Sequence, residues 1–267
     1  MQKNKRGTAP VLTAENYFSP ESQAYYMSAS QFKSFMKCEA ATIAELRGEY
    51  TRPQSTALLV GSYVDAYFEG KAEAFQAQHP EMFTKKGELK AEFRHAQDVI
   101  ARIERDPLFM QMLSGEKQVI RTGTLGGVPF KIKMDSYFPG RLIVDLKVMR
   151  DFQPIWSEAK QQRVHFIEAW GYDLQGAVYQ AIEGHELPFF IAAATKETEP
   201  DIAVLSVPQY VLDAQRYIVE MLAKRFDDLK HGISTPARCE HCDYCKRTKQ
   251  LTEIIDYTTV LGGTYTC

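Results

Sequence analysis

The sequence predicts an α/β fold in which a mixed central β-sheet is flanked by helices. Helical patterns fill the first part of the chain, and three strand-like segments follow one another in the middle. A helix and two further strand-like segments come next, ahead of a long final helix. Helices, then a meander, then alternating helix and strand are typical of a mixed sheet with helices packed on it.

The helices are predicted from caps, stops and apolar spacing. Ser28 or Ser30 can cap the first helix, and Gly48 ends it. Gly70 stops the second helix in the same way. The expected helices cover residues 28–46, 56–68, two or three short stretches of 73–113, 167–183 and 211–229.

The strands are predicted from runs of β-branched and aromatic residues. The expected strands cover residues 118–124, 128–137, 141–149, 188–195 and 202–207. Only a short turn containing Gly140 separates the second strand from the third, which predicts a hairpin. The first three strands are therefore expected to form a meander.

The 267 residues divide into three expected parts. Residues 1–27 look irregular, residues 28–238 form the main domain, and residues 239–267 carry a cysteine cluster and a tail that packs on it. No apolar run is long enough to span a bilayer, and no signal peptide is recognisable, so we expect a cytoplasmic protein without membrane contact. The net charge of −2 argues against a generally basic nucleic-acid binder, although local basic patches can still bind DNA.

Two adjacent strands carry the residues with the clearest chemistry. Asp135 closes an alternating segment, and Asp145 and Lys147 stand two apart on the next strand, so they share one face. A solvated strand face with a surface ion pair is the ordinary explanation. However, Asp145 lies in an apolar strand, where a carboxylate is costly unless it is paired or binds a metal. Two carboxylates for a hard divalent cation and a nearby ammonium suit phosphodiester hydrolysis.

Two predicted helices add supporting side chains. Gln175 and Tyr179 stand four apart and share a helix face, from which they can position substrate or Lys147. Asp65 lies among apolar neighbours on the second helix and can complete a metal site. Each of these patterns alone also fits an ordinary amphipathic helix.

Three cysteines at positions 239, 242 and 245 are too closely spaced for simple packing, and in a cytoplasmic chain they favour metal binding over disulfides. They need a fourth ligand. Cys38 can also be read as a buried, small apolar residue.

The order of these pieces resembles the PD-(D/E)xK nuclease superfamily. Within it, the chain resembles the RecB-type branch, which includes phage and prophage exonucleases similar to exonuclease VIII. The resemblance lies in the order helix Asp65, strand Asp135, strand Asp145-Leu146-Lys147 and helix Gln175-x-x-x-Tyr179. The segments from Ser28 to Cys38 and from Thr195 to Glu197 also resemble that branch. The resemblance implies a restriction-endonuclease-like core. The sequence departs from the pattern of the superfamily at two positions. RecB-type members often have histidine at the position of Asp65. Other branches often have glutamate at the position of Asp145, although aspartate is usual in the RecB-type branch.

The resemblance also implies a role for the cysteines. Some RecB-type nucleases hold a [4Fe–4S] cluster with one cysteine of the opening helix and three near the C-terminus. Cys38, Cys239, Cys242 and Cys245 match that arrangement. Four thiolates suit iron–sulfur or zinc, and His241 keeps a Cys/His zinc site as the alternative. Either centre is expected to be structural.

The function predicted by the motifs and the resemblance is metal-dependent DNA exonuclease activity. Asp65, Asp135, Asp145 and the Leu146 carbonyl are expected to hold Mg²⁺ or Mn²⁺, with Lys147 activating water and stabilising charge. A further set of lysines is expected to contact DNA phosphates: Lys131, Lys133 and Lys196.

Two alternatives stay open, an inactive DNA-binding protein on the same fold and a zinc or iron–sulfur cluster protein. A prophage recombination or DNA repair role, a single-strand annealing partner and a homo-oligomer follow from the resemblance alone.

Overall fold

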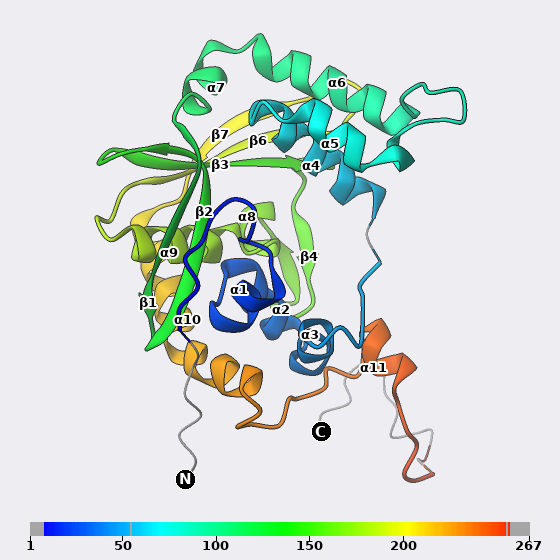
Figure 1. Cartoon of the computed structure of the whole chain (residues 1–267), viewed down its shortest axis with the longest axis vertical. Coiled ribbons are helices and arrows are strands. Elements are labelled where there is room, and N and C mark those ends of the chain that lie inside the picture. Colours follow the sequence, from blue (N-terminus) through cyan, green and yellow to red (C-terminus); the bar gives the residue numbers. More distant parts are fainter. Residues whose placement is uncertain (1–7, 54, 255, 257–267) are drawn as a thin grey trace.

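A five-stranded β-sheet forms the centre of the computed structural model, which describes residues 8–53, 55–254 and 256 (Figure 1). The strands lie in the order β1 (Glu116–Leu125), β2 (Val128–Phe138), β3 (Leu142–Met149), β6 (Phe189–Thr195) and β7 (Ile202–Ser206). Strands β3 and β6 run parallel, and the other neighbouring pairs are antiparallel. The mixed sheet and the β1–β2–β3 meander predicted from the sequence are confirmed.

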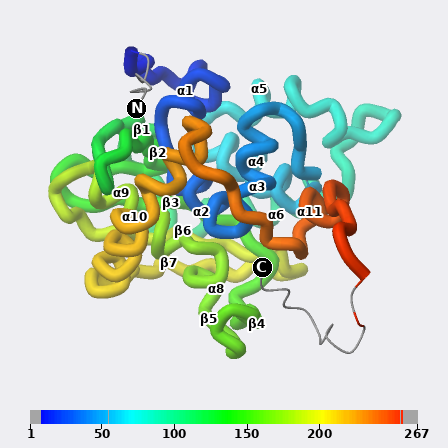
Figure 2. The backbone as a smooth tube through the Cα atoms, turned by 90° about the horizontal axis from the view of Figure 1, so that it is seen from below, coloured from blue at the N-terminus to red at the C-terminus, as the bar shows by residue number. Residues whose placement is uncertain are grey.

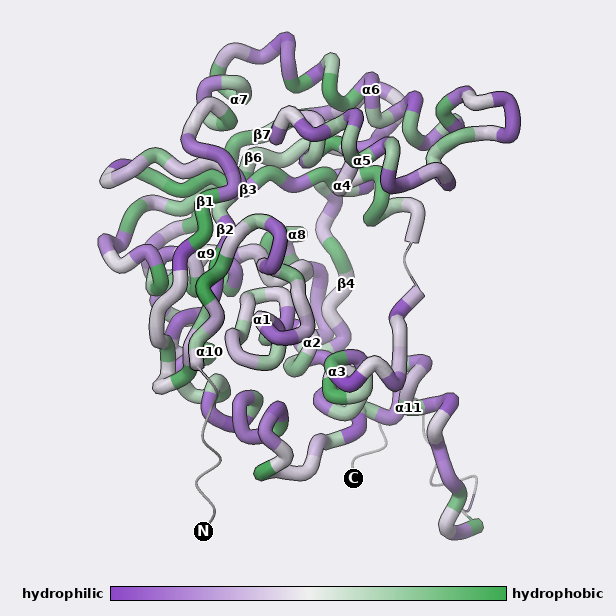
Figure 3. The backbone as a smooth tube through the Cα atoms, in the orientation of Figure 1, coloured by the Kyte–Doolittle hydropathy of each residue, from purple (hydrophilic) through white to green (hydrophobic). Residues whose placement is uncertain are grey.

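Helices cover both faces of the sheet. One face packs against α2 (Ala29–Lys37), α9 (Tyr172–Glu183) and α10 (Gln209–Lys230), and the other against α4 (Thr56–Phe68) and α6 (Ala91–Glu104). Each face of the sheet therefore has its own hydrophobic core. Strand β3 contributes to both, because Ile143 packs in the core beneath α2, α9 and α10, and Val144 packs in the core beneath α4 and α6. Figure 3 shows the apolar residues gathered along the central strands. In the described part of the chain, every helix is too short or too polar to cross a membrane.

Shorter elements complete the chain. They are α1 (Pro20–Tyr25), α3 (Glu39–Leu46), α5 (Ala72–Gln78), the 3₁₀ turn η1 (Pro80–Met82), α7 (Pro107–Met112), β4 (Ile155–Ser157), β5 (Gln162–Val164), α8 (Phe166–Ala169) and α11 (Asp243–Arg247). Helix α1 lies in the segment that we expected to be irregular, and the β4–β5 hairpin was not predicted. Both are too short to give a periodic pattern. Residues 257–267 of the expected C-terminal tail lie outside the described residues.

The helix expected over residues 28–46 is in fact two helices. Cys38 is extended, with φ −165° and ψ 110°, and it separates α2 from α3. Its sulfur accepts a hydrogen bond from the backbone N–H of Ala41 at 3.4 Å and so caps α3. Both halves keep a helical apolar pattern, so periodicity alone cannot reveal the break.

The helix expected over residues 167–183 is also divided, into α8 and α9. Gly171 has φ +61° and lies between them. A Cβ atom there would lie 2.8 Å from Cδ of Lys33, so the glycine also lets α2 approach closely.

Strands β2 and β3 diverge, and this creates the space for a site. They pair only beside their turn, from Phe138 opposite Leu142 to Ser136 opposite Val144. Farther along β2, Met27 takes the place of β3: its N–H donates to the Pro129 carbonyl at 2.8 Å. Asp135 and Asp145 lie where the two strands separate.

Gly176 is expected to tolerate no side chain. An added Cβ would lie 2.5 Å from Cδ1 of Phe189, so Gly176→Ala should overpack the contact between α9 and β6. We expect it to lower the free energy of unfolding by about 1–3 kcal/mol in denaturant titration.

Gly61→Ala on α4 is the matched control. The nearest atom to its added Cβ is 4.0 Å away, so this change should instead stabilise the protein by about 0.5–1 kcal/mol. Equal effects of the two variants would contradict the packing described here.

Candidate active site

Six residues predicted from the sequence meet in one cavity. Strand β2 supplies Asp135, strand β3 supplies Asp145 and Lys147, and helix α4 supplies Asp65. Helix α9 supplies Gln175 and Tyr179. The cavity has a volume of about 290 Å³ and opens at the divergence of β2 and β3.

Asp145 is the most buried member of the group, with 1% of its surface exposed. Its Oδ1 accepts a hydrogen bond from Nε2 of Gln175 at 2.7 Å, and its Oδ2 pairs with the ammonium of Lys147. Burial raises the pKa of Asp145 to about 7, although the Lys147 ammonium lowers it. The carboxylate is therefore held in place by one amide and one cation.

Asp135 is fixed by the diverging strands themselves. Its Oδ2 accepts a hydrogen bond from the backbone N–H of Leu146 at 3.1 Å, where the antiparallel pairing of β2 and β3 has already ended. Its Oδ1 accepts from Nε2 of Gln118 at 3.2 Å. Burial raises the pKa of Asp65 well above its ordinary value, and the Asp135 carboxylate raises it further.

Lys147 is the cation among these carboxylates. Burial lowers its pKa, but Asp145, Asp135 and Asp65 outweigh burial and hold that pKa above its ordinary value. Lys147 therefore stays protonated at neutral pH. Its Nζ contacts Oδ2 of Asp145 and donates to the Leu146 carbonyl at 3.2 Å. Two of the oxygens that the sequence assigns to a divalent metal thus already face a positive charge.

The donors of this cavity fit a hard divalent cation. Carboxylate and carbonyl oxygens are the ligands that Mg²⁺ and Mn²⁺ prefer. Three carboxylates in one buried site also repel one another, and a divalent cation would relieve that repulsion.

The three lysines expected to contact DNA occupy different surroundings. Lys131 and Lys133 both line the cavity that holds the carboxylates. Lys131 is only 2% exposed, and its ammonium donates to the Tyr17 carbonyl and, at 2.5 Å, to Oγ of Ser22. Lys196 donates to the Ala57 carbonyl at 3.1 Å and lines a separate cavity. Only Lys133 therefore faces the carboxylates with its ammonium free of such backbone anchors.

Sequence reasoning missed several residues that surround the site. Tyr17 and Phe18 line the cavity from the segment that was expected to be irregular. Lys33 of α2 and Lys147 lie 5.4 and 5.3 Å from the ring centroid of Tyr172. Burial lowers the pKa of Lys33 to about 8, and the nearby charge of Lys147 lowers it further. No local pattern marks these residues, because their positions depend on how α1 and α2 pack over the sheet.

The four predicted cysteines come together away from this cavity. The sulfurs of Cys38, Cys239, Cys242 and Cys245 all lie within 4.8 Å of one another. Sγ of Cys245 is 3.6 Å from Sγ of Cys38 and 4.0 Å from that of Cys239. No other group of three or more histidine, cysteine or acidic side chains in the described ranges is so compact, and His241 does not belong to it. This four-cysteine group can therefore bind a metal.

The cysteine group joins the two ends of the main domain. Figures 1 and 2 show α11 beside α3, with Cys245 on α11 and Cys38 at the start of α3. Next to it, Glu39 accepts two hydrogen bonds from Arg225 of α10, at 2.6 and 2.7 Å. Glu39 also accepts from the N–H of Ala237 at 2.7 Å. Polar contacts thus hold the C-terminal segment next to the four cysteines.

The diverging strands, three carboxylates and an ammonium on a mixed sheet define a PD-(D/E)xK-type site. Residues 28–248 match the family described as a PDDEXK-like domain of unknown function, DUF3799, and the chain belongs to that family. The resemblance and the restriction-endonuclease-like fold predicted from the sequence are thereby confirmed.

A crystal structure of a candidate exonuclease from Eubacterium rectale is similar to this chain. The two share 47% sequence identity and a TM-score of 0.90, over 96% of this chain and 100% of the other. A second structure, of a protein called SSO0001, has 12% identity and a TM-score of 0.27 over 73% of this chain and 86% of its own. That likeness is too weak to carry an argument. No protein with a curated description matches the sequence. The family and the first neighbour together indicate nuclease activity.

Lys131 is predicted to hold the Tyr17–Ser22 segment over the site. Hydrogen bonds from a charged group contribute about 1.5–3 kcal/mol, so Lys131→Met should release this segment. Amide hydrogen exchange should then quicken over residues 17–25. Lys196→Met is the matched control: its ammonium anchors the Ala57 carbonyl in a separate cavity, so exchange over residues 17–25 should stay unchanged. Unchanged exchange in Lys131→Met would exclude the anchoring role.

The cysteine group is predicted to bind a metal that stabilises the fold. Cys242→Ser should lose that metal, as measured by elemental analysis, and should lower the Tm by about 5 °C or more. His241→Ala should keep the metal, because His241 lies outside the group. Full metal content in Cys242→Ser would refute the assignment of this ligand.

Proposed function

We propose that the protein is a metal-dependent exodeoxyribonuclease that hydrolyses phosphodiester bonds of DNA. The observation that carries this proposal is the meeting of Asp135, Asp145 and Lys147 in one cavity, with Gln175 bonded to Asp145. The neighbour from Eubacterium rectale, described as a candidate exonuclease, supports the choice of an exonuclease over other nucleases.

Asp65, Asp135, Asp145 and the Leu146 carbonyl would hold Mg²⁺ or Mn²⁺. When bound, the ion supplies Lewis-acid stabilisation of the phosphate and lowers the pKa of water. Gln175 keeps Asp145 oriented through its 2.7 Å hydrogen bond. Tyr179 donates to the Lys133 carbonyl at 2.9 Å and so fixes strand β2 next to the carboxylates.

Lys147 contributes a positive charge to the reaction. Its raised pKa means that it remains an ammonium at neutral pH, so it can donate hydrogen bonds to a phosphate oxygen and orient the attacking water. A group that stays protonated is a poor general base. Lys133 is the second phosphate contact that we propose. For Lys131 and Lys196, the anchored ammonium groups favour a positioning role.

The two alternatives have less support. An inactive DNA-binding protein would have no need for three carboxylates and an ammonium at a buried site, where charge is costly. A redox role would place the cysteine group near the reacting atoms. None of the four cysteines lines the carboxylate cavity, so we propose that their centre is structural.

Two observations favour different metals at the cysteine group: the family resemblance favours iron–sulfur, and the distances between the sulfurs favour zinc. The resemblance to RecB-type nucleases favours a [4Fe–4S] cluster. The sulfur separations of 3.6 and 4.0 Å are close to the edge of a tetrahedron around a single zinc ion, about 3.8 Å for Zn–S bonds of about 2.3 Å. Iron, sulfide and zinc analysis of the purified protein distinguishes the iron–sulfur cluster from the zinc ion.

We propose four further properties from the sequence alone. They are a prophage recombination or DNA repair role, a single-strand annealing partner, a homo-oligomer and a cytoplasmic location.

Asp145→Asn is predicted to abolish cleavage without unfolding the protein. The amide keeps the shape of the side chain but loses the charge that would hold the metal. We expect kcat to fall at least about a hundredfold on end-labelled linear DNA with Mg²⁺ or Mn²⁺, a loss of roughly 3 kcal/mol in transition-state stabilisation.

Asp98→Asn, on the exposed side of α6, is the control and should retain full activity. Circular dichroism and the Tm test whether Asp145→Asn is folded. Wild-type cleavage that persists in chelator, or a folded Asp145→Asn that cleaves normally, would disprove the proposed site.

A further inference from the structure

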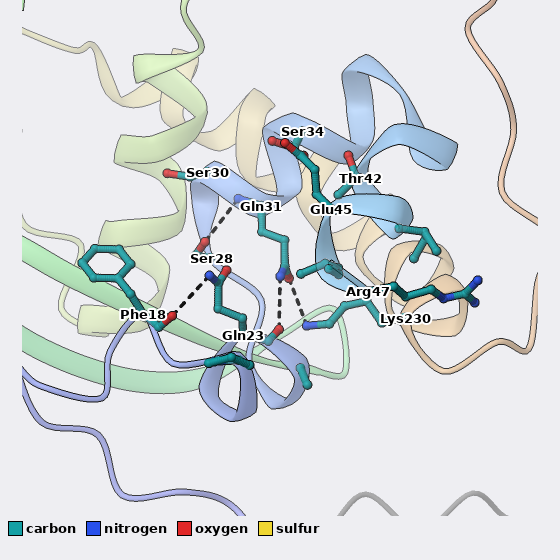
Figure 4. Close-up of a pocket in the computed structure, with 14 residues that line it drawn as sticks. Phe18, Gln23, Ser28, Ser30, Gln31, Ser34, Thr42, Glu45, Arg47 and Lys230 are labelled. Atoms are coloured by element: carbon teal, nitrogen blue, oxygen red, sulfur yellow. Dashed lines mark hydrogen bonds between the residues drawn. The ribbon is translucent and has the colours of Figure 1, made fainter. Parts of the chain in front are cut away.

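A second cavity adjoins the carboxylate cavity. It has a volume of about 480 Å³ and lies between α1, α2, α3 and the end of α10. Phe18, Ser28 and Ser30 line both cavities, so the two meet at these residues. Figure 4 shows Phe18 at one end of this second cavity and Arg47 and Lys230 toward the other.

The chemistry of the second cavity suits a polynucleotide backbone. Its walls carry hydroxyl and amide side chains that can donate to phosphate and sugar oxygens: Ser28, Ser30, Ser34 and Gln23. Glu45 is the only acidic residue lining it, and Glu45 pairs with Arg52 at 2.9 Å. Arg47 is exposed, and within the described residues its guanidinium makes no hydrogen bond or ion pair, so it is available to an anion.

Phe18 adds an aromatic surface at the junction. Its side chain is 65% exposed, although it is large and apolar. Nζ of Lys133, the proposed phosphate contact, lies 5.0 Å from the centroid of the Phe18 ring. An exposed ring beside a cation is the combination on which single-stranded nucleic acids stack their bases.

We propose that this second cavity holds the single DNA strand next to the scissile phosphate. The strand passes from the carboxylates over Phe18, along the serines of α2, toward Arg47. This inference rests on the proposed nuclease function and adds the form of the substrate, a single strand several nucleotides long.

A third cavity, of about 540 Å³, is the alternative path. It is lined by apolar side chains that include Leu58, Ile155 and Trp170, and also by Arg150 and Lys196. It shares no lining residue with the carboxylate cavity, whereas the second cavity shares three. Both of its cations are already engaged, because Arg150 pairs with Asp151 at 2.6 Å and Lys196 donates to the Ala57 carbonyl. The second cavity is therefore the better continuation of the site.

The test is equilibrium binding of fluorescent oligothymidylates of 3 and 15 nucleotides in the Asp145→Asn background, where cleavage is blocked. The longer strand should bind more tightly. Phe18→Ala should weaken its binding between about 5-fold and 150-fold, and Phe18→Trp should restore it. Arg47→Ala should reduce the slope of log affinity against log salt by about 0.7, the loss of one phosphate contact on a single strand.

Arg141→Ala, at the exposed β2–β3 turn and lining none of these cavities, is the matched control and should leave affinity and slope unchanged. Wild-type cleavage together with normal binding by the Phe18 and Arg47 variants would overturn this inference but leave the nuclease function intact. The same holds if Trp170→Ala, not Phe18→Ala, weakens binding. Absence of both cleavage and binding by the folded protein would overturn the nuclease function itself, and this inference with it.

Discussion

The structure depends on keeping several charges together in a place that water barely reaches. Asp145 is 1% exposed, yet it lies within reach of Asp135 and Asp65, and the ammonium of Lys147 stands among these three carboxylates. Carboxylates in such surroundings resist ionisation, because burial and like charge both oppose it. A fold can retain such buried carboxylates only if it holds their hydrogen-bond donors in place. Three elements around the cavity, α9, β3 and β1, supply these donors. Gln175 of α9 bonds Asp145, the backbone of β3 bonds Asp135, and Gln118 of β1 bonds the second oxygen of Asp135.

The divergence of β2 and β3 supplies one of these hydrogen-bond donors from the backbone. Had the two strands stayed paired, the N–H of Leu146 would be occupied by the ladder and could not bond Asp135. The N-terminal segment makes the divergence possible, because Met27 satisfies the backbone of β2 where β3 has left it. Lys131 then uses its buried ammonium to hold the same segment. The N-terminal residues are thus part of the site's framework.

Much of this arrangement could be predicted from the sequence, and the exceptions share a cause. Asp135, Asp145 and Lys147 were identified because strand alternation places them on known faces, and Gln175 and Tyr179 because helix spacing does the same. The role of Lys131 could not be found in this way, and that of Cys38 was predicted only from the resemblance to RecB-type nucleases. Lys131 alternates like a solvent-facing lysine, but α1 covers it. Cys38 sits in a helical pattern, but its partners lie near the other end of the chain. Phe18 and Lys33 likewise depend on the packing of distant segments, which carries no local signal.

The cysteine group has a consequence for how the protein is made. Cys38 and Cys245 are 207 residues apart, yet they contribute to the same centre. During synthesis, Cys38 leaves the ribosome long before its partners exist, so the α2–α3 junction waits as a half-built ligand set. The four sulfurs can come together only after Cys245 has been synthesised. A chain that stops before Cys239 would therefore carry Asp65, Asp135 and Asp145 but only one of the four cysteines.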